Sequence, residues 1–285
     1  MWYRAVVMNT IALAPTSLPT TAAIEYVQAA SEAGFQAIGM RFFRSPGLGY
    51  GFDPIAGDAA KMRDMQHALR DSGMQLLEVL SYYLTPEMDI DGMLPSLEFA
   101  AQCGATYALL IGDDPEWQRM VDNYGRFCDE LAKLKMVAAI EAPVFRRVLH
   151  TIPLTAQLIV DAGRPNGAIC LDPSHFIECG HTPNDLKGLD PKLFPYTQIN
   201  QSYTINRLGS KHWRAEPHDR SGLGRNLSQG QVPLAEILDI LPAGLPLSVE
   251  WPKPRDLEKT PAEWAKHVLD GTRAFLDGYY SSKGK

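Results

Sequence analysis

The chain has 285 residues, of which 45% are hydrophobic and 21% charged, a balance that supports a large buried core and excludes general disorder. Its formal net charge of −6 argues against a general nucleic-acid binder, because such proteins usually carry a basic excess. No stretch approaches the roughly 18 apolar residues of a transmembrane helix, so we expect no membrane partner.

The N-terminal segment resembles a secretory signal, but we interpret it as the start of the fold. An apolar run follows Arg4, and Asn9 and Thr10 then interrupt it within a segment, 1–14, that is short for a signal peptide. We therefore expect the first strand at Tyr3–Met8. The four cysteines form no CxxC pair and no zinc-ribbon spacing, which is typical of thiols in a reducing compartment. Together these features predict a soluble, cytoplasmic protein.

A helix that ends in a small residue and a glycine, followed by a short apolar strand, recurs along the chain. The helix ends are Ala33-Gly34, Ser72-Gly73, Cys103-Gly104 and Ala162-Gly163. Glycine after the last helical residue is a typical C-cap, since the left-handed conformation there carries no Cβ penalty. The strands that follow are almost continuously apolar, as expected of parallel strands buried on both faces.

The whole chain is predicted to fold as eight strands that alternate with about eight helices. In chain order the expected strands are Tyr3–Met8, Phe35–Met40, Met74–Leu80, Tyr107–Ile111, Met136–Ile140, Ala168–Leu171, Tyr196–Asn200 and Leu247–Val249. The clearest helices are Ala22–Ala33, Glu98–Gln102, Trp117–Leu134 and Glu263–Phe275. Strand–helix alternation at roughly 36 residues per unit predicts an α/β protein, a single (β/α)₈ TIM barrel over residues 1–285. A doubly wound open sheet is the alternative, but no G-x-G-x-x-G follows the first strand.

Four successive strands end in polar groups that could hold a metal. These groups are Glu141, Asp172, Gln198 and Glu250. Residues just past the carboxyl ends of barrel strands face the active site, and carboxylates gathered there would repel one another unless a cation lay between them. Oxygen ligands favour Mn²⁺, which we expect, or Mg²⁺ or Co²⁺. For any one of these acids, capping of the next helix is the alternative role.

With these strand ends, the chain resembles the xylose-isomerase-like TIM-barrel superfamily. That group includes sugar and sugar-phosphate isomerases and epimerases, inosose and dehydroshikimate dehydratases, and endonuclease IV. The resemblance covers nearly the whole chain and is carried by Ile140-Glu141, Leu171-Asp172-Pro173-Ser174-His175, Gln198-Ile199-Asn200 and Val249-Glu250-Trp251. The D-x-x-H element is the most specific of these pieces.

The resemblance implies a metal site and leaves the reaction open. It implies that the metal ligands are Glu141, Asp172, Gln198 and Glu250. His175 is implied either to bind the metal or to contact a residue that does. In sugar epimerases the strand-seven ligand is usually His, whereas Gln198 resembles several dehydratase-like members. Many dehydroshikimate dehydratases carry His two residues after the strand-five Glu, where this chain has Pro143.

The chemistry that we expect is proton transfer next to a carbonyl group. A divalent ion that bridges two substrate oxygens stabilises an enediolate. Glu141 and Glu250 are the expected acid/base pair, and His175 is expected to donate to a substrate oxygen or to shuttle the proton. This predicts an isomerase or epimerase acting on a sugar or related polyhydroxy carbonyl compound. A dehydratase acting on a cyclic hydroxy-ketone or hydroxy-acid is the close alternative, and a metal-free binding barrel is a third.

Several residues are candidates for contact with a small-molecule substrate. The connection between the last two strands has a local excess of basic residues, and we expect Arg220, helped by Lys211 or Arg225, to pair with a carboxylate or phosphate. A solvated charged loop is the alternative. Arg41 is a second candidate anion contact, and Trp251 could wall the pocket, with packing under loops as its alternative. Glu78 could belong to the site or to a polar network in the core. By analogy with relatives, we expect a homo-oligomer.

Overall fold

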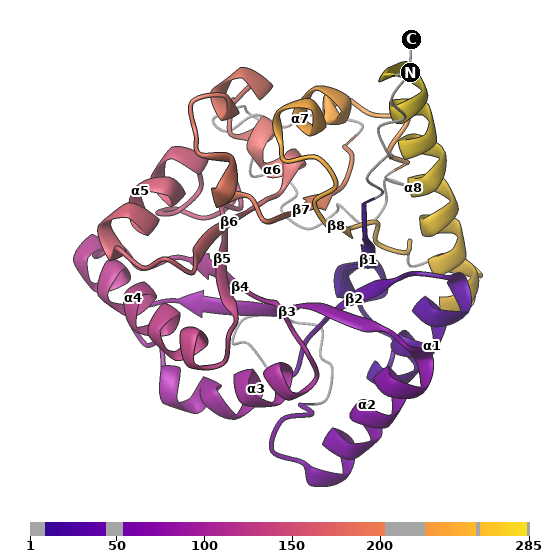
Figure 1. Cartoon of the computed structure of the whole chain (residues 1–285), viewed down its shortest axis with the longest axis horizontal. Coiled ribbons are helices and arrows are strands. Elements are labelled where there is room, and N and C mark those ends of the chain that lie inside the picture. The colour runs from indigo at the N-terminus through magenta and orange to yellow at the C-terminus, as the bar shows by residue number, and fades with distance from the viewer. Residues whose placement is uncertain (1–8, 44–53, 203–225, 255–256, 284–285) are drawn as a thin grey trace, which may run out of the picture.

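The computed structural model describes residues 9–43, 54–202, 226–254 and 257–283. The strands form a closed parallel barrel in the order β1 to β8, with the helices arranged around it (Figure 1). The strands are β1 Ile11–Leu13, β2 Ala37–Met40, β3 Gln75–Leu84, β4 Tyr107–Gly112, β5 Val137–Glu141, β6 Gly167–Leu171, β7 Tyr196–Ile199 and β8 Leu247–Val249. The predicted single (β/α)₈ barrel is therefore confirmed as the fold class.

The described helices follow the strands as the alternating pattern requires. They are α1 Ala23–Ala33, α2 Ala59–Ser72, α3 Ile90–Gln102, α4 Trp117–Lys133, α5 Ile152–Ala162, α6 Pro173–Glu178, α7 Leu234–Ile240 and α8 Pro261–Lys283. Gly34, Gly73 and Gly163 end α1, α2 and α5 with left-handed backbone, as the recurring unit predicts. Within the described ranges, no helix combines the length and the apolar composition needed to cross a membrane.

The first barrel strand lies later in the chain than we expected. β1 is Ile11–Leu13, and it closes the barrel by pairing with β2 and β8. The expected strand at Tyr3–Met8 lies outside the described residues and does not supply this strand. In the sequence, Asn9 interrupts the apolar run and so marks the end of the expected strand. In the structure, its Nδ2 donates to the Leu245 carbonyl over 2.7 Å, two residues before β1 begins. A three-residue strand after a polar pair is too short to show as a pattern.

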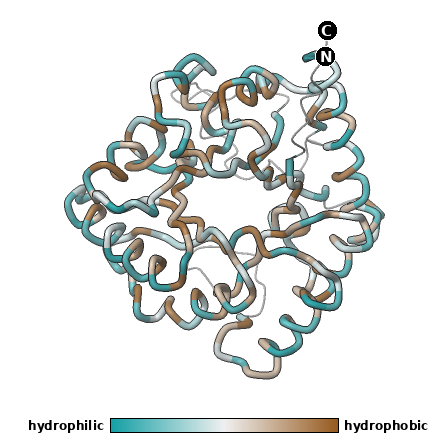
Figure 2. Tube along the Cα trace, in the orientation of Figure 1, coloured by the Kyte–Doolittle hydropathy of each residue, from teal (hydrophilic) through white to brown (hydrophobic). Residues whose placement is uncertain are grey.

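The core has two parts, one inside the barrel and one between the barrel and its helices. The interior cluster is small and contains Ala12, Ala37, Leu77, Leu80, Tyr107, Leu109, Ala139, Cys170 and Tyr196. A much larger cluster fills the space between strands and helices. Figure 2 shows hydrophobic residues along the strands that ring the centre and more hydrophilic stretches on the outer helices. All four cysteines are described, and none forms a disulfide.

Candidate metal centre

Three side chains that follow β5 and β6 meet at the carboxyl end of the barrel. Glu141 ends β5, Asp172 follows β6, and His175 lies in the first turn of α6. One ligand atom from each lies within 4.8 Å of the others, and all three residues are buried. His175 Nε2 is 3.6 Å from Glu141 Oε1 and 3.8 Å from Asp172 Oδ2. The arrangement could hold a metal ion, as the resemblance implied for this part of the chain.

The orientation of Asp172 is fixed from two sides. Its Oδ1 accepts the backbone N–H of His175 over 2.8 Å, so that it caps the short helix α6. Its Oδ2 accepts from Asn200 Nδ2 over 2.6 Å, and Asn200 Oδ1 in turn accepts from Ser174 Oγ over 2.6 Å. Capping does not exclude metal binding, because a carboxylate offers about four acceptor positions. Asn200 and Ser174 were not among the expected site residues, although both lie within the motifs that carry the resemblance.

A second polar group joins the ends of β7 and β8. Gln198 Nε2 donates to Glu250 Oε1 over 3.1 Å, and Thr16 Oγ1 donates to the same oxygen over 3.0 Å. Gln198 is only 1% exposed, and its Oε1 is buried with no hydrogen-bond partner among the residues that the structure describes. A buried acceptor left unpaired costs about 1–3 kcal/mol, which a cation placed against it would remove.

The register of the barrel relates the two groups. Leu171 of β6 pairs with Thr197 of β7, so the next positions on these neighbouring strands are Asp172 and Gln198. Adjacent strands lie about 4.8 Å apart. Both groups therefore lie at the carboxyl-end rim of the barrel, on consecutive strands.

The donor atoms at this rim fit a divalent ion. Two buried carboxylates lie within a few ångströms of each other beside an imidazole. On the next strand lies the Gln198 amide oxygen, for which the described residues supply no partner. Carboxylates this close repel unless a positive charge compensates them. The expectation from the sequence used oxygen donors alone. His175 adds a nitrogen donor, which extends the fitting ions from Mn²⁺, Mg²⁺ and Co²⁺ to Zn²⁺.

An aromatic and cationic wall lies beside the cluster. The Phe145 ring meets the His175 ring edge-on with 5.3 Å between centroids, and Phe145 is 45% exposed. The Arg146 guanidinium lies 5.0 Å from the centre of the Tyr83 ring and forms an ion pair of 3.0 Å with Asp113. Sequence reasoning did not select Phe145 or Arg146, since both lie in the irregular loop after β5, where no pattern marks them.

Of the expected substrate contacts, the structure describes Arg41 and Trp251, and both are buried. Arg41 is 5% exposed, and its positive charge acts against the rise that burial causes in the pKa of Glu78. Trp251 is 2% exposed and packs edge-on against Trp264 of α8 with 6.0 Å between centroids, which favours the packing alternative. Arg220, Lys211 and Arg225 lie outside the described residues.

Glu78 belongs to a polar network inside the barrel. It is fully buried, its Oε2 accepts from Tyr196 Oη over 2.7 Å, and its Oε1 accepts from Ser248 Oγ over 2.5 Å. Burial raises its pKa, while the two hydrogen bonds and Arg41 act in the opposite direction. Of the two roles that the sequence left open for Glu78, the structure favours the core network.

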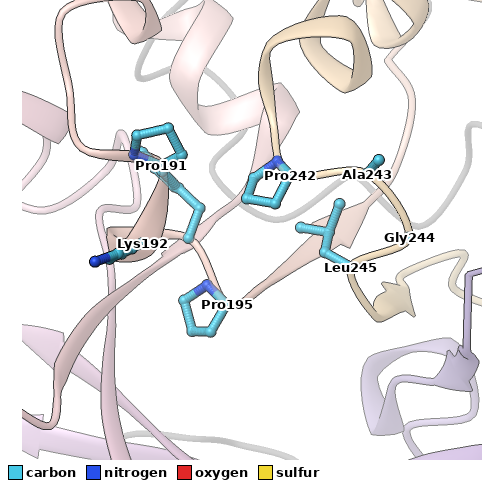
Figure 3. Close-up of a pocket in the computed structure, with 8 residues that line it drawn as sticks. Pro191, Lys192, Pro195, Pro242, Ala243, Gly244 and Leu245 are labelled. Atoms are coloured by element: carbon cyan, nitrogen blue, oxygen red, sulfur yellow. The ribbon is translucent and has the colours of Figure 1, made fainter.

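A hollow at the opposite end of the barrel is separate from these residues. It has a volume of about 520 Å³ and lies at the residues that lead into β7 and β8, including Pro191, Pro195, Pro242 and Leu245 (Figure 3). Its lining is mainly apolar, with Lys192 as the charged residue. The amino ends of barrel strands support stability rather than catalysis, so this hollow is not the candidate active site.

Comparison with known proteins agrees with this arrangement. The sequence model of the xylose isomerase-like TIM barrel family matches residues 27–275. The chain belongs to this family. No curated protein sequence matches the chain. The chain covers 42% of a xylose isomerase-like TIM barrel/4-hydroxyphenylpyruvate dioxygenase fusion protein, with a TM-score of 0.71 and 17% identity over 93% of its own length.

Solved structures that match the family fold include enzymes of different reaction types. The IolI protein, described with a binding zinc atom, has a TM-score of 0.72 at 16% identity, covering 95% of this chain and 99% of that one. The probable 3-DHS dehydratase AsbF from Bacillus anthracis has a TM-score of 0.69 at 17% identity, covering 92% and 98%. D-allulose 3-epimerase from Methylomonas sp., in complex with D-allulose, has a TM-score of 0.65 at 14% identity, covering 96% and 98%. At these identities, the likeness shows the fold.

Proposed function

We propose that this family member is a divalent-metal-dependent isomerase or epimerase of a sugar or related polyhydroxy carbonyl compound. The observation that carries the proposal is the buried cluster of Glu141, Asp172 and His175 at the carboxyl end of the barrel. The similarity to a D-allulose epimerase fold supports the substrate class, and the zinc atom bound in the IolI structure supports a metal-dependent protein.

The proposed metal ligands come from four consecutive strands. They are Glu141, Asp172, Gln198 and Glu250, with His175 as a further donor. When bound there, a divalent ion supplies Lewis-acid polarisation of a substrate carbonyl, which acidifies the neighbouring C–H group. Gln198 Oε1, which has no hydrogen-bond partner in the described part of the chain, supports this set, because the amide already donates its N–H to Glu250.

In this proposal Glu141 and Glu250 move the proton. They end β5 and follow β8, so they approach a bound substrate from different sides of the barrel rim. One carboxylate removes the proton next to the carbonyl, and the other returns a proton to the neighbouring carbon or the opposite face. When His175 does not itself bind the ion, it donates to a substrate oxygen; its ring meets the Phe145 ring edge-on. Anion contacts by Arg41, Arg220 and Lys211 belong to the same proposal.

A dehydratase is the second candidate, and Gln198 is the observation that favours it. Glutamine at the end of the seventh strand resembles dehydratase-like members, and the AsbF fold is similar over 92% of this chain. Loss of a hydroxyl from the carbon next to the deprotonated one would give an unsaturated product. The two candidates share the same first proton transfer, so their products distinguish them.

Solvent isotope exchange tests the proposal. The protein, loaded with Mn²⁺, Co²⁺ or Zn²⁺ in turn, is incubated in D₂O with a panel of ketoses, polyol ketones and cyclic hydroxy-acids, and the mixtures are read by NMR. We expect deuterium at the carbon next to the carbonyl together with an epimer or isomer. We expect neither with Glu141→Gln, whereas Glu98→Gln, an exposed acid of α3, should retain exchange.

Two outcomes would count against the isomerase. An unsaturated product with any substrate of the panel would support the dehydratase instead. Absence of deuterium exchange and of any product across the panel, from protein that holds metal, would overturn both enzymatic candidates.

A further inference from the structure

Glu78 connects strands that lie across the barrel from its own. In the closed order, β3 pairs with β2 and β4. The hydrogen bonds from Tyr196 on β7 and Ser248 on β8 to Glu78 therefore cross the interior of the barrel, over 2.7 and 2.5 Å. Both hydroxyl groups donate, and the two oxygens of Glu78 accept one bond each.

The two donors lie directly below two proposed ligands. Side chains two residues apart on a strand point to the same face. Tyr196 precedes Gln198 by two residues, and Ser248 precedes Glu250 by two residues. Glu78 thus holds the interior residue beneath the amide at the end of β7 and beneath the carboxylate at the end of β8.

Two residues of β2 and its end provide space and a positive charge beside Glu78. A Cβ at Gly39 on β2 would lie 3.0 Å from both Cγ and Oε1 of Glu78, so the absence of a side chain at this position makes space for the carboxyl. The positive charge of Arg41, two residues further along, favours the ionised carboxylate and so acts against the rise in pKa that burial causes. Burying an ionised acid costs free energy even when it is hydrogen-bonded, so packing alone does not explain this residue in the interior.

The backbone alone holds the ends of β7 and β8 over few residues. β6 and β7 are paired at two positions, β7 and β8 at three, and β8 and β1 at three. β8 itself has only three residues. Because the backbone pairing of these strands is short, side-chain hydrogen bonds in the interior help to fix the directions in which Gln198 and Glu250 point.

We propose that Glu78 is a positioning residue for the metal centre, fixing Gln198 and Glu250 by holding Tyr196 and Ser248 across the interior of the barrel. This inference rests on the metal site of the proposed function. The competing role is that the network only stabilises the barrel. Under that role, changes to the network would lower stability and leave the affinity of the folded protein for metal unchanged.

Matched hydroxyl deletions separate these roles. Tyr196→Phe and Ser248→Ala each remove one donor to Glu78, and Glu78→Gln removes the charge. The controls are Tyr82→Phe and Ser96→Ala, which break a buried Tyr–Ser hydrogen bond of 2.9 Å between β3 and α3. Each control removes the same atoms as its partner variant, from a residue that is similarly buried and bonds outside the Glu78 network.

The readouts are the Mn²⁺ dissociation constant of metal-stripped, folded protein by calorimetry and the urea unfolding of the same metal-free protein. We expect all five variants to lose stability. We expect Mn²⁺ to bind about tenfold more weakly to Tyr196→Phe, Ser248→Ala and Glu78→Gln, because residues that orient ligands typically have effects of this size. The two controls should bind within about twofold of the unchanged protein.

Each result has a distinct meaning. If Tyr196→Phe and Ser248→Ala bind Mn²⁺ as tightly as their controls, the positioning role of Glu78 is overturned while the metal site stands. If the unchanged protein binds no divalent ion, the proposed function fails and this inference fails with it. Should Glu78→Gln not fold, the two hydroxyl deletions still decide the question.

Discussion

Replacement of Gly271 by alanine should destabilise the protein through the residue that follows Glu250. Trp251 is buried against α8, and a Cβ at Gly271 would lie 2.7 Å from its Cζ3 and 3.0 Å from its Cη2. These are atoms of a rigid ring that also contacts Trp264 and His267. The indole cannot withdraw without disturbing both neighbours, so the added methyl group must shift α8 or the end of β8.

The magnitude follows from two opposing effects. Overpacking a well-packed core costs about 1–3 kcal/mol. Alanine in place of glycine inside a helix returns about 0.8–1.0 kcal/mol. Gly278 of the same helix is exposed, and no atom of the described ranges lies within 4 Å of its added Cβ, so Gly278→Ala receives only the helical gain. The difference between the two variants isolates the steric cost, which we expect to be about 1–3 kcal/mol.

Urea unfolding of both metal-free variants, followed by circular dichroism, measures this difference. We expect Gly278→Ala to unfold at a higher urea concentration than the unchanged protein and Gly271→Ala at a lower one. Equal free energies of unfolding for the two alanine variants would refute the placement of the Trp251 ring against α8.

Three further outcomes are expected. Burial raises the pKa of Glu78 above its ordinary 4.5, so the folded state holds this proton more tightly than the unfolded chain. The stability that this proton contributes is complete below about pH 4.5 and is lost as the pH rises through the raised pKa. The difference in unfolding free energy between the metal-free protein and Glu78→Gln should therefore change over this pH window. A constant difference would contradict the shift. Asn200→Ala removes the donor to Asp172 Oδ2 and should weaken divalent-ion binding about tenfold by calorimetry, with unchanged affinity as the contrary result. Phe145→Ala should alter the unfolding free energy by less than about 1 kcal/mol, because the ring is 45% exposed, while raising KM for substrate; a large loss of stability would show that the ring is mainly structural.

The barrel could be predicted because its signals are local. The glycine caps of α1, α2 and α5 and the apolar strands after them repeat often enough to fix the alternation and hence the architecture. The first strand could not be placed, since Ile11–Leu13 has only three residues. It is defined by its pairing with β2 and β8, and the sequence carries no local mark of those contacts.

The candidate site was predictable at the level of strand ends. Because residues after parallel barrel strands gather at one rim, Glu141, Asp172 and His175 could be selected, and the structure brings them together. Contacts made between distant segments could not be foreseen. Thr16 reaches Glu250 across 234 positions, and no periodicity marks such a pair.

Trp251 shows the limit of strand-end reasoning. A large aromatic residue at the end of β8 is equally compatible with a pocket wall and with packing under a helix. The choice depends on where α8 lies, and the small residue Gly271 that receives the indole is twenty positions further along the chain. The sequence therefore predicted that Trp251 lies at the end of β8, but it did not decide whether the ring lines a pocket or packs against a helix.

Metal titration of the metal-stripped protein tests the central claim most directly. Calorimetry with Mn²⁺, Co²⁺ and Zn²⁺ should show a single site per chain, retained in the surface control Glu98→Gln. Binding should weaken by at least about tenfold in Glu141→Gln and in Asp172→Asn. Failure of all three ions to bind, or equal affinity in the two site variants and the control, would contradict a metal centre at the carboxyl end of this barrel.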